Sequence, residues 1–461
     1  MSGIVKSENA AVRTQPPALG PQRPVAWPAR TAFRLPNGIQ VVLAERRNFP
    51  RVRLELFFRS GNAVAMHRLP GLGEMTAAVV RAGTKSRDQR QVDEELRRMG
   101  ADLGTSAGAD TSAIAVSGLA EFLPGLADLV ADLARKAMFP DRDFERERRQ
   151  KLEELRIART TSGFLGSERM RGVLFGHHPY ARLAPTEKEV ESYRREDLTA
   201  FYGEHYVPEN ALIVAVGDFD TMRTREIIEK QFADWKGIQS ARPATPAPPE
   251  LKGRQVHLVD LPGAVQAEVL VGNRAITRRD PNWPQLVLAN SLFGGAFNSR
   301  LVMNIREQKG YTYSPRSTAH ALREYGYFTV HAAVRNEVTA ATLTEIFYEM
   351  DRMRSLPVGA DELDDAKNYV TGAFSLGVAT LDGVAGQVSS MYLEELPKDY
   401  LEKYRDKIQA LSSEEIMAAA RSYFDSVNAQ IVVVGNAAVL RDQAELFGPV
   451  TEWTAEGKQR D

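Results

Sequence analysis

The amino-acid sequence predicts an α+β fold built from two homologous halves, each an α/β sandwich that layers helices on antiparallel strands. The first observation behind this prediction is a stretch of small, polar and proline residues at 236–253, which is typical of a semi-rigid linker. The second is that the segments on its two sides resemble each other in order and type. We therefore expect a first half at 31–235 and a second half at 254–450, flanked by tails at 1–30 and 451–461.

The similarity between the halves is clearest where each half ends. FYGEHYVPENALIVAVGDF at 201–219 compares with ARSYFDSVNAQIVVVGNAA at 420–438: a helical segment leads through an Asn into an Ile- and Val-rich strand that closes on Gly. Earlier in each half, residues 125–148 and 341–367 both predict an amphipathic helix, a proline break and a highly charged helix. Internal similarity of this kind indicates a duplicated architecture.

The first half begins with a proline-punctuated tail that we expect to be disordered, and then alternates strands and helices. Asn37-Gly38 marks the turn of an opening hairpin, and Ser86 is expected to cap the helix that ends before Gly100. A hairpin at 101–118 is expected to supply a strand at the edge of the sheet. The other elements are predicted as strands at 52–58 and 211–216 and as helices at 72–82, 122–137, 142–160 and before Tyr206.

The stretch FGGAFNSRLVMNIREQKGYTYSP at 293–315 organises the second half. Gly294 and Gly295 allow a tight bend, and Ser299 is expected to cap a short helix with an apolar face of Leu, Val and Ile. Gly310 suits the left-handed position that ends a helix. The tyrosines that alternate with polar residues after it predict a strand.

The composition excludes several classes of function and partner. The 461 residues carry 59 basic and 60 acidic side chains, a balance that gives no reason to expect nucleic acid or an acidic surface as a partner. The absence of cysteine excludes thiol catalysis, thiolate metal sites and disulfides. No apolar run approaches the roughly 20 residues of a membrane span, and no signal peptide is visible. The location stays open: the cytoplasm by default, or the periplasm if a leader has been removed.

Within the organising stretch, REQKGYTY puts Arg306 in the last helical turn and Tyr313 on the strand that follows, seven residues later. Together with the preceding FGG and SRL, this spacing resembles the C-terminal half of the insulinase- and pitrilysin-like zinc metallopeptidases, the inverzincins, and in particular their processing-peptidase-like branch. In that family the Arg and the Tyr hold the backbone of the substrate. The resemblance covers roughly residues 31–450 and implies two halves that close like a clam shell around an extended peptide. Without it, Arg306 fits a solvated helix-end cation and Tyr313 a core tyrosine equally well.

Catalytic members of this family carry His-x-x-Glu-His on a helix of the N-terminal half. The two His bind zinc, and the Glu activates the metal-bound water. In this chain, Gly71-Leu72 and Gly83-Thr84 bracket the corresponding segment. By the resemblance, the first His position falls on Glu74, the base on Ala77 and the second His on Ala78.

The family's third zinc ligand is a Glu on the later charged helix, and its position falls on Glu154, with Glu147 seven residues before it. Alanine has no lone pair for zinc and no proton to move. Two carboxylates alone make a weak zinc site, because zinc prefers nitrogen or sulfur ligands as well. We therefore expect no catalytic residue and no metal in this chain, and we expect Glu147 and Glu154 on a solvated helix face. Shifting the alignment to His67 supplies no partner for it.

The other histidines show no ligand spacing on one element. His177 and His178 lie in a GHHPY loop that is expected to be structural, and His320 and His331 are expected as packed cross-strand neighbours on a hairpin. The sequence contains no phosphate-binding loop, no Gly-x-Ser-x-Gly elbow and no dinucleotide fingerprint.

The resemblance implies a non-catalytic, substrate-binding subunit of a heteromeric zinc metalloendopeptidase that degrades or processes peptides. A homologous partner chain would supply zinc, water and the base, in a heterodimer or a dimer of heterodimers. Arg306 and Tyr313 would hold the extended peptide substrate. Two alternatives stay open: a structural or assembly subunit similar to the respiratory core proteins, with no proteolytic role, and an autonomous peptidase with an unusual metal site.

Overall fold

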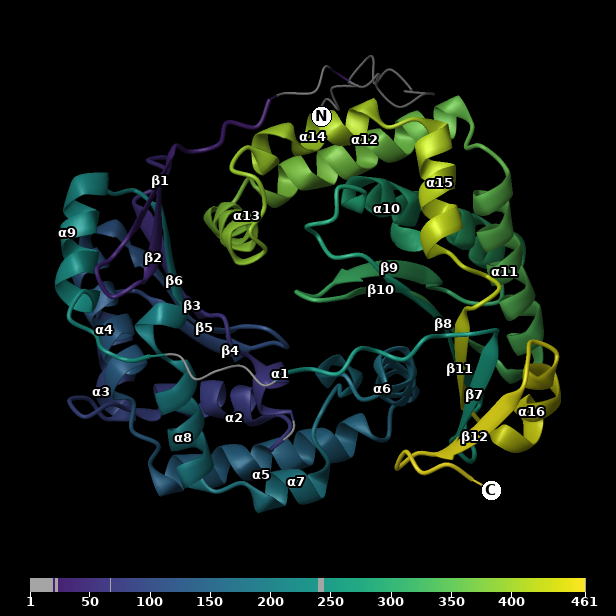
Figure 1. Ribbon diagram of the computed structural model, residues 1–461, viewed down its shortest axis with the longest axis horizontal. Coiled ribbons are helices and arrows are strands. Elements are labelled where there is room, and N and C mark those ends of the chain that lie inside the picture. Colours follow the sequence, from purple (N-terminus) through teal and green to yellow (C-terminus); the bar gives the residue numbers. More distant parts are fainter. Residues whose placement is uncertain (1–19, 21–23, 67, 239–243, 461) are drawn as a thin grey trace, which may run out of the picture.

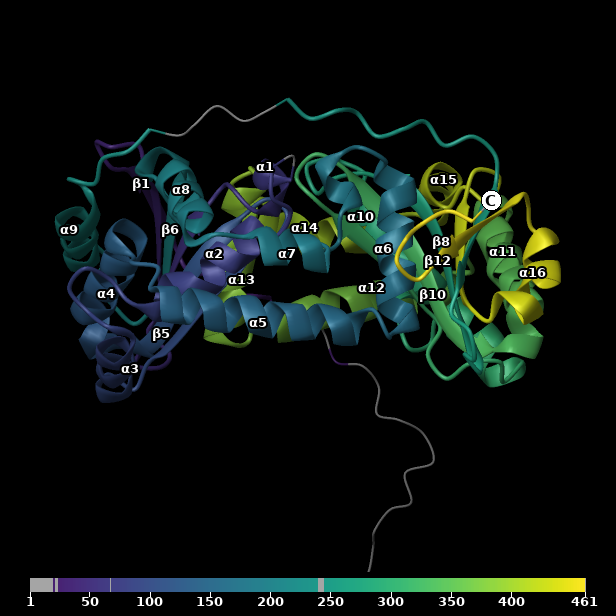
Figure 2. The same ribbon diagram turned by 90° about the horizontal axis from the view of Figure 1, so that it is seen from below.

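The computed structural model describes residues 20, 24–66, 68–238 and 244–460, so most of the expected N-terminal tail at 1–30 lies outside the described residues. Two six-stranded sheets form the centres of two halves that lie side by side (Figure 1). The two-half α+β architecture predicted from the internal repeat is confirmed. The described parts of the linker cross from one half to the other along the outside of the molecule (Figure 2).

The first sheet takes all of its strands from the first half. Across the sheet they are β1 (Arg30–Arg34), β2 (Gln40–Glu45), β6 (Ala211–Gly217), β3 (Arg51–Phe58), β5 (Ser112–Leu119) and β4 (Asp102–Ala107). The edge strand predicted from the hairpin at 101–118 is β4. Neighbouring strands pair antiparallel except β2 and β6, which run parallel with Val42 opposite Val214. The expectation of purely antiparallel strands is wrong for this pair, because a long connection returns the chain to the sheet in the same direction.

The second sheet repeats the order of the first. Across it lie β12 (Val450–Thr454), β7 (Gln255–Asp260), β11 (Gln430–Gly435), β8 (Gln266–Ala275), β10 (Gly326–Arg335) and β9 (Arg316–Ala321). Strands β6 and β11, which the sequence matched, hold equivalent places. The outer position differs, since β1 comes from the start of the chain and β12 from its end. β12 pairs with β7 in parallel, so part of the expected tail at 451–461 belongs to the sheet.

The helices of the first half are α1 (Asn62–Ala65), α2 (Leu72–Val79), α3 (Gln89–Arg98), α4 (Leu123–Lys136), α5 (Asp141–Ala158), α6 (Ser162–Phe175), α7 (Glu187–Ser192), α8 (Arg195–His205) and α9 (Thr221–Phe232). The sequence predicts α2, α3, α4, α5 and α8, but it does not predict the other four, α1, α6, α7 and α9. The cap of α3 is not Ser86 but Asp88, whose carboxylate accepts a hydrogen bond from the Gln91 amide at 2.8 Å. Ser86 donates to Asp132 at 2.7 Å instead.

The helices of the second half continue the repeat. They are α10 (Trp283–Asn290), α11 (Thr339–Ser355), α12 (Ala360–Gly377), α13 (Leu381–Leu393), α14 (Tyr400–Ala410), α15 (Ser413–Tyr423) and α16 (Ala437–Glu445). α11 and α12 correspond to α4 and α5, as the matched segments predict. Among the helices that the structure describes, none is long and apolar enough to cross a bilayer.

Helix α6 belongs to the first half in sequence but packs on the sheet of the second half, against β8 and β11. Leu165 and Met170 of this helix share one apolar cluster with Leu270 and Val432 of the sheet. The contact is close, because a Cβ atom added to Gly166 would lie 2.5 Å from Leu270 Cδ1. Any larger residue at this point would require the Leu270 side chain to move.

Helix α13 makes the opposite exchange: it belongs to the second half and packs on β3 and β6 of the first sheet. Its Ser389 donates a hydrogen bond to the buried Glu55 of β3 at 2.5 Å. The loop before it accepts hydrogen bonds from Arg46, at the end of β2, through the carbonyls of Ala379 and Thr380. The two halves are thus interlocked by a pair of exchanged helices.

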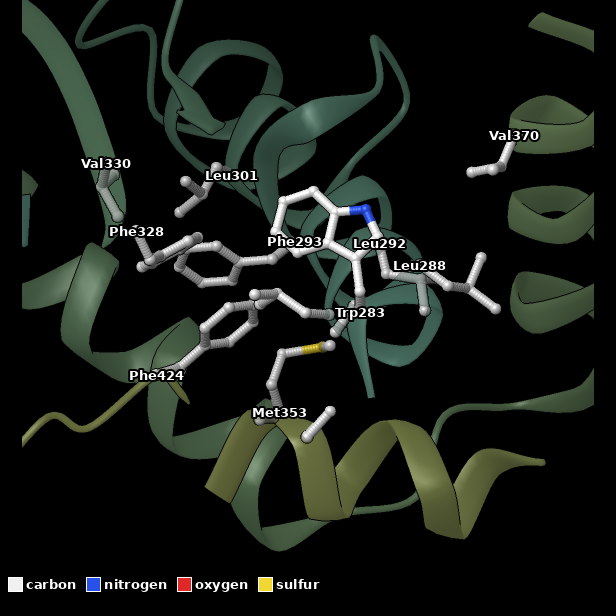
Figure 3. Packing of buried hydrophobic residues seen from close by; sticks show 14 of the residues in the cluster. Trp283, Leu288, Leu292, Phe293, Leu301, Phe328, Val330, Met353, Val370 and Phe424 are labelled. Carbon is white, nitrogen blue, oxygen red and sulfur yellow. The ribbon is translucent and has the colours of Figure 1, made fainter. Parts of the chain in front are cut away.

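Buried aromatic residues of the second half hold the start of the stretch at 293–315 in place. Phe293 is fully buried, and its ring centre lies 5.0 Å from that of Phe424 and 5.8 Å from that of Phe328 (Figure 3). Gly294 does not form the expected tight bend, because residues 291–295 extend α10 by a wide, π-helical turn. Close packing is what requires glycine here, since a Cβ atom on Gly294 would meet backbone and side-chain atoms at under 3 Å.

The helix that follows is also wider than an α-helix, over Val302–Gln308. Ser299 is not its cap, as its buried hydroxyl has no hydrogen-bond partner among the described residues. Gly310 has the predicted left-handed conformation, with a φ angle of 63°. The strand expected next does not form at 311–315, which is irregular, and β9 begins only at Arg316. Wide helical turns of this kind are frequent at functional sites.

Candidate functional site

A cavity of about 300 Å³ lies where the zinc motif of the resembled family is expected. Its walls are α2, the edge strand β4 and the charged helix α5. The structure brings all four motif positions to this cavity, and these are Glu74, Ala77, Ala78 and Glu154. The four positions that the resemblance assigns to the zinc motif therefore lie together around one cavity.

The side chain of Lys151, on α5, lies among the carboxylates of this cavity. Its ammonium is 2.8 Å from a carboxylate oxygen of Glu74 and 3.9 Å from one of Glu154, and the side chain is only 18% exposed. The second Glu154 oxygen accepts a hydrogen bond from Gln150 at 2.9 Å. The positive charge in this cavity is thus supplied by the chain itself.

Glu147 lines the same cavity and is paired with Arg146 at 3.1 Å. Its side chain is 20% exposed, whereas that of Glu154 is half-exposed. Glu154 is thus on a solvated part of the helix, as expected, whereas Glu147 is only partly exposed. Both carboxylates face a cavity shared with α2, which the charge pattern of α5 alone does not reveal.

The residues of this cavity do not fit a zinc ion. Ala77 and Ala78 offer no ligand atom, and the Lys151 ammonium next to Glu74 would repel a cation. Within the described ranges, no group of three or more His, Cys, Asp or Glu side chains is arranged to hold a metal ion. We therefore assign no step of a metal-dependent hydrolysis to these side chains.

Arg306 and Tyr313 meet on the second half, as the family resemblance implies. The guanidinium carbon of Arg306 lies 4.4 Å from the centre of the Tyr313 ring and 4.9 Å from the centre of the Phe297 ring. Its Nε is 3.2 Å from the carboxylate of Glu307, and the side chain is 23% exposed. Two cation–π contacts and one ion pair therefore hold the planar guanidinium in place.

Tyr313 is not the core tyrosine that the bare sequence also allowed, since it is 79% exposed. Its hydroxyl makes no hydrogen bond to the residues that the structure describes. The backbone before it is fixed by Thr312, whose hydroxyl donates to the Ala333 carbonyl of β10 at 2.5 Å. A fixed and exposed ring with a free hydroxyl is available to a ligand that brings an acceptor.

The histidines of the β9–β10 hairpin are not direct cross-strand neighbours. His320 lies opposite Tyr327, with the two rings stacked at 4.2 Å, and His331 lies opposite Arg316. The expectation that the two histidines face each other is wrong, because the length of the turn between β9 and β10 sets the register of the two strands. Burial, together with a nearby arginine in each case, lowers the pKa of both His320 and His331 to about 4, so both are neutral at pH 7.

The GHHPY loop has the structural role that the sequence predicts. His178 is buried, its Nδ1 accepts a hydrogen bond from the Tyr180 amide at 3.1 Å, and its Nε2 lies 3.1 Å from the Glu324 carboxylate. The Tyr180 hydroxyl donates to Asp110 at 2.6 Å. These contacts connect the loop to the β4–β5 turn of the first half and the β9–β10 turn of the second.

Sequence reasoning missed two residues of these sites. Lys151 gives no signal, because nothing in the sequence shows that it points toward Glu74 on a distant helix. Phe297 stands within the FGGAFNSR segment but was not singled out. Its signal is an aromatic residue followed by polar ones in a turn, where burial is not expected, and the structure leaves it 70% exposed.

Two interlocked α+β halves, with a metal-motif cavity between a helix, an edge strand and a charged helix, define a protein built on a metallopeptidase fold. The chain belongs to peptidase family M16, the insulinase family. The family model for insulinase (peptidase family M16) matches residues 40–163, and the model for the peptidase M16 inactive domain matches residues 192–370.

The relatives agree with this assignment. A Streptomyces coelicolor protein called an uncharacterized zinc protease is 22% identical over 84% of this chain and 85% of its own length. A Mycobacterium tuberculosis protein of the same description is 24% identical over 88% and 93%. The crystal structure of a peptidase M16 inactive domain from Pseudomonas fluorescens is 26% identical, with a TM-score of 0.83 over 88% of this chain and 98% of that one. A protease from Helicobacter pylori, 19% identical with a TM-score of 0.81 over 88% and 99%, shares the fold.

Proposed function

We propose that this chain is the non-catalytic, substrate-binding subunit of a heteromeric zinc metalloendopeptidase that degrades or processes peptides. The observation that carries the proposal is an exposed Tyr313 ring on the partly exposed Arg306 guanidinium, in a chain whose zinc-motif positions offer no zinc ligand set. The held Arg306 guanidinium and the exposed Tyr313 hydroxyl together offer hydrogen-bond donors to a bound peptide, which supports a substrate-binding role for this chain.

In this proposal a homologous partner chain supplies the zinc, which activates water and polarises the peptide carbonyl. The present chain contributes hydrogen-bond donors. The N–H groups of Arg306 and the hydroxyl of Tyr313 donate to carbonyl oxygens of an extended peptide, including the oxygen that becomes negatively charged during hydrolysis. Because the guanidinium is already held between two rings and Glu307, little of its freedom is lost when the peptide binds.

The test is reconstitution from purified chains. The chain is first isolated from its native lysate, and a co-purifying homologue that carries His-x-x-Glu-His is identified and produced separately. We expect cleavage of a fluorogenic peptide only when both chains are present, and we expect a chelator to abolish it. Tyr313→Phe in the reconstituted complex should lower turnover about 10² to 10³-fold, as the loss of an oxyanion donor does.

A matched control is available on α11, where Tyr348 is also exposed and lies 5.5 Å from the guanidinium of Arg352. Tyr348→Phe should leave turnover unchanged. If Tyr313→Phe and Arg306→Ala are as active as the unmodified complex, the proposed role is wrong. The structural or assembly subunit then becomes the better description.

A further inference from the structure

Phe297 is a large apolar side chain kept at the surface beside the Arg306–Tyr313 pair. Its ring is 70% exposed and contacts the same guanidinium as Tyr313 does. Exposed single hydrophobic residues are common, but this one lies in a turn that is fixed on both sides. Phe293 before it and Leu301 after it are fully buried in the core of the second half.

The backbone of this turn is itself hydrogen-bonded. The Ala296 amide donates to the Ser291 carbonyl at 3.2 Å, and the Ser299 amide donates to the Ala296 carbonyl at 3.2 Å. Phe297 is therefore presented by a rigid scaffold, which is how binding sites hold their side chains. Its exposed ring is a fixed feature of the surface around Arg306.

We propose that Phe297 is the third member of the peptide-holding site and forms an apolar subsite next to it. This inference rests on the proposed function. A peptide carbonyl that accepts a hydrogen bond from Arg306 lies close to the Phe297 ring, because that ring is 4.9 Å from the guanidinium carbon. The side chain adjacent to the held carbonyl then covers the ring, and a large aliphatic or aromatic side chain gains most from doing so.

The charges beside the ring do not oppose an apolar ligand. Arg306 is paired with the half-exposed Glu307, so the pair carries no net charge, and the Phe297 ring is the feature that distinguishes peptide side chains at this subsite. The preferred ligand is thus an extended peptide with a large apolar residue next to the carbonyl that Arg306 binds. Phe297 selects the side chain, whereas Arg306 and Tyr313 bind the backbone, which is common to all peptides.

The experiment compares two fluorescein-labelled peptides that are identical except for one central residue, leucine in one and aspartate in the other. Fluorescence anisotropy gives the dissociation constant of each peptide for the full chain. For the unmodified chain we expect tighter binding of the leucine peptide. Phe297→Ala should reduce this preference about tenfold, the lower end of what one apolar group contributes in a binding site. Phe297→Leu should keep most of it.

Phe49 supplies the control, because it is 68% exposed on the turn before β3, in the other half. Phe49→Ala should leave both dissociation constants unchanged. Arg306→Ala should weaken both peptides equally and so tests the proposed function separately.

The outcomes are distinguishable. Loss of the leucine preference in Phe297→Ala, with Phe49→Ala unchanged, supports the apolar subsite. If Phe297→Ala leaves the ratio of the two dissociation constants unchanged, the subsite is overturned. If both peptides also bind more weakly, Phe297 only positions Arg306. If Arg306→Ala binds both peptides as well as the unmodified chain, the proposed function itself fails.

Discussion

At the scale of single residues, the metal-motif cavity shows how a lysine can balance two carboxylates that line one cavity. Glu74 and Glu154 face the same cavity of about 300 Å³, where two negative charges without a cation would repel each other. Lys151 compensates both, from a position that is largely shielded from solvent. The lysine thus preserves the contact between α2 and α5 that the motif positions share.

Replacing Lys151 with methionine should therefore destabilise the fold. We expect a loss of about 1 kcal/mol in the free energy of unfolding, at the upper end for partly exposed ion pairs, and a smaller loss at high salt. Urea unfolding at pH 7 measures it. Lys403→Met is the control, because Lys403 forms a similar pair with Asp399 in which both side chains are well exposed. Equal effects of the two substitutions would show that the cavity lysine has no special role.

Asp132 is the second residue whose surroundings predict a measurable property. Burial alone would raise its pKa, but the hydrogen-bond donors around the carboxylate outweigh burial and lower its pKa to about 2. These donors are Thr84, Ser86, Arg87 and Lys136. A pKa lowered from 3.8 means that the ionised carboxylate stabilises the folded state above about pH 4. This contribution is lost as the pH falls from about 4 to 2.

Asp132→Asn should remove this contribution at neutral pH, at a cost of up to about 2 kcal/mol. The difference in unfolding free energy between the variant and the unmodified chain should shrink as the pH falls below 4. Urea unfolding at pH 7 and at pH 3 measures both values. A difference that stays constant between the two pH values would contradict the assignment.

The family resemblance implied that Arg306 and Tyr313 act together, and the structure places the two side chains in contact. The sequence could not predict that Phe297 joins them. Phe297 lies in the turn before the helix that carries Arg306, so helical periodicity does not relate the two residues. The direction of that turn follows from the wide turns at 291–295 and 302–308 on its two sides, which no local pattern reveals.

At the scale of elements, the sequence predicted about half of the helices and most strands, because the apolar faces of these elements are buried as their patterns require. Helix ends were less well predicted. Ser86 and Asp88 are both good capping residues, and only the geometry shows that Asp88 forms the reciprocal pair of hydrogen bonds with Gln91. The tyrosine strand expected after Gly310 failed for a similar reason, since the Thr312 hydroxyl bonds to the backbone of β10 in place of strand pairing.

The cap of α3 gives a prediction at this scale. Asp88→Ala should lower the free energy of unfolding by about 1 kcal/mol and increase hydrogen exchange at the Gln91 amide, which loses its acceptor. Ser86→Ala is the comparison, because it breaks a hydrogen bond to Asp132 but leaves the first turn of α3 capped. Hydrogen exchange followed by NMR or mass spectrometry distinguishes the two. Faster exchange at Gln91 in Ser86→Ala but not in Asp88→Ala would reverse the assignment.

At the scale of the whole molecule, the internal repeat predicted two halves and a linker but not the exchange of α6 and α13 between them. The apolar face of an amphipathic helix shows that the helix packs on a sheet, but not on which of the two sheets it packs. The two sheets have the same strand order, so a helix near the boundary fits either in principle. The exchange follows from three-dimensional fit, in particular from Gly166 beneath Leu270 and from the hydrogen bond between Ser389 and Glu55.

The exchange predicts that the halves stay together when the linker is cut. A protease site placed at 246–249 and cleaved should leave two fragments that co-elute in size-exclusion chromatography and unfold in one thermal transition, because each fragment covers part of the other's sheet.

Gly166→Val should weaken the association of the two fragments, since its side chain would overlap Leu270 Cδ1. Gly163→Val on the same helix is the matched control: it exchanges the same two residue types, but nothing lies within 4 Å of its Cβ position. Fragments that separate without any substitution, or equal effects of the two valines, would show that α6 does not hold the halves together and that the clam shell can open about its linker.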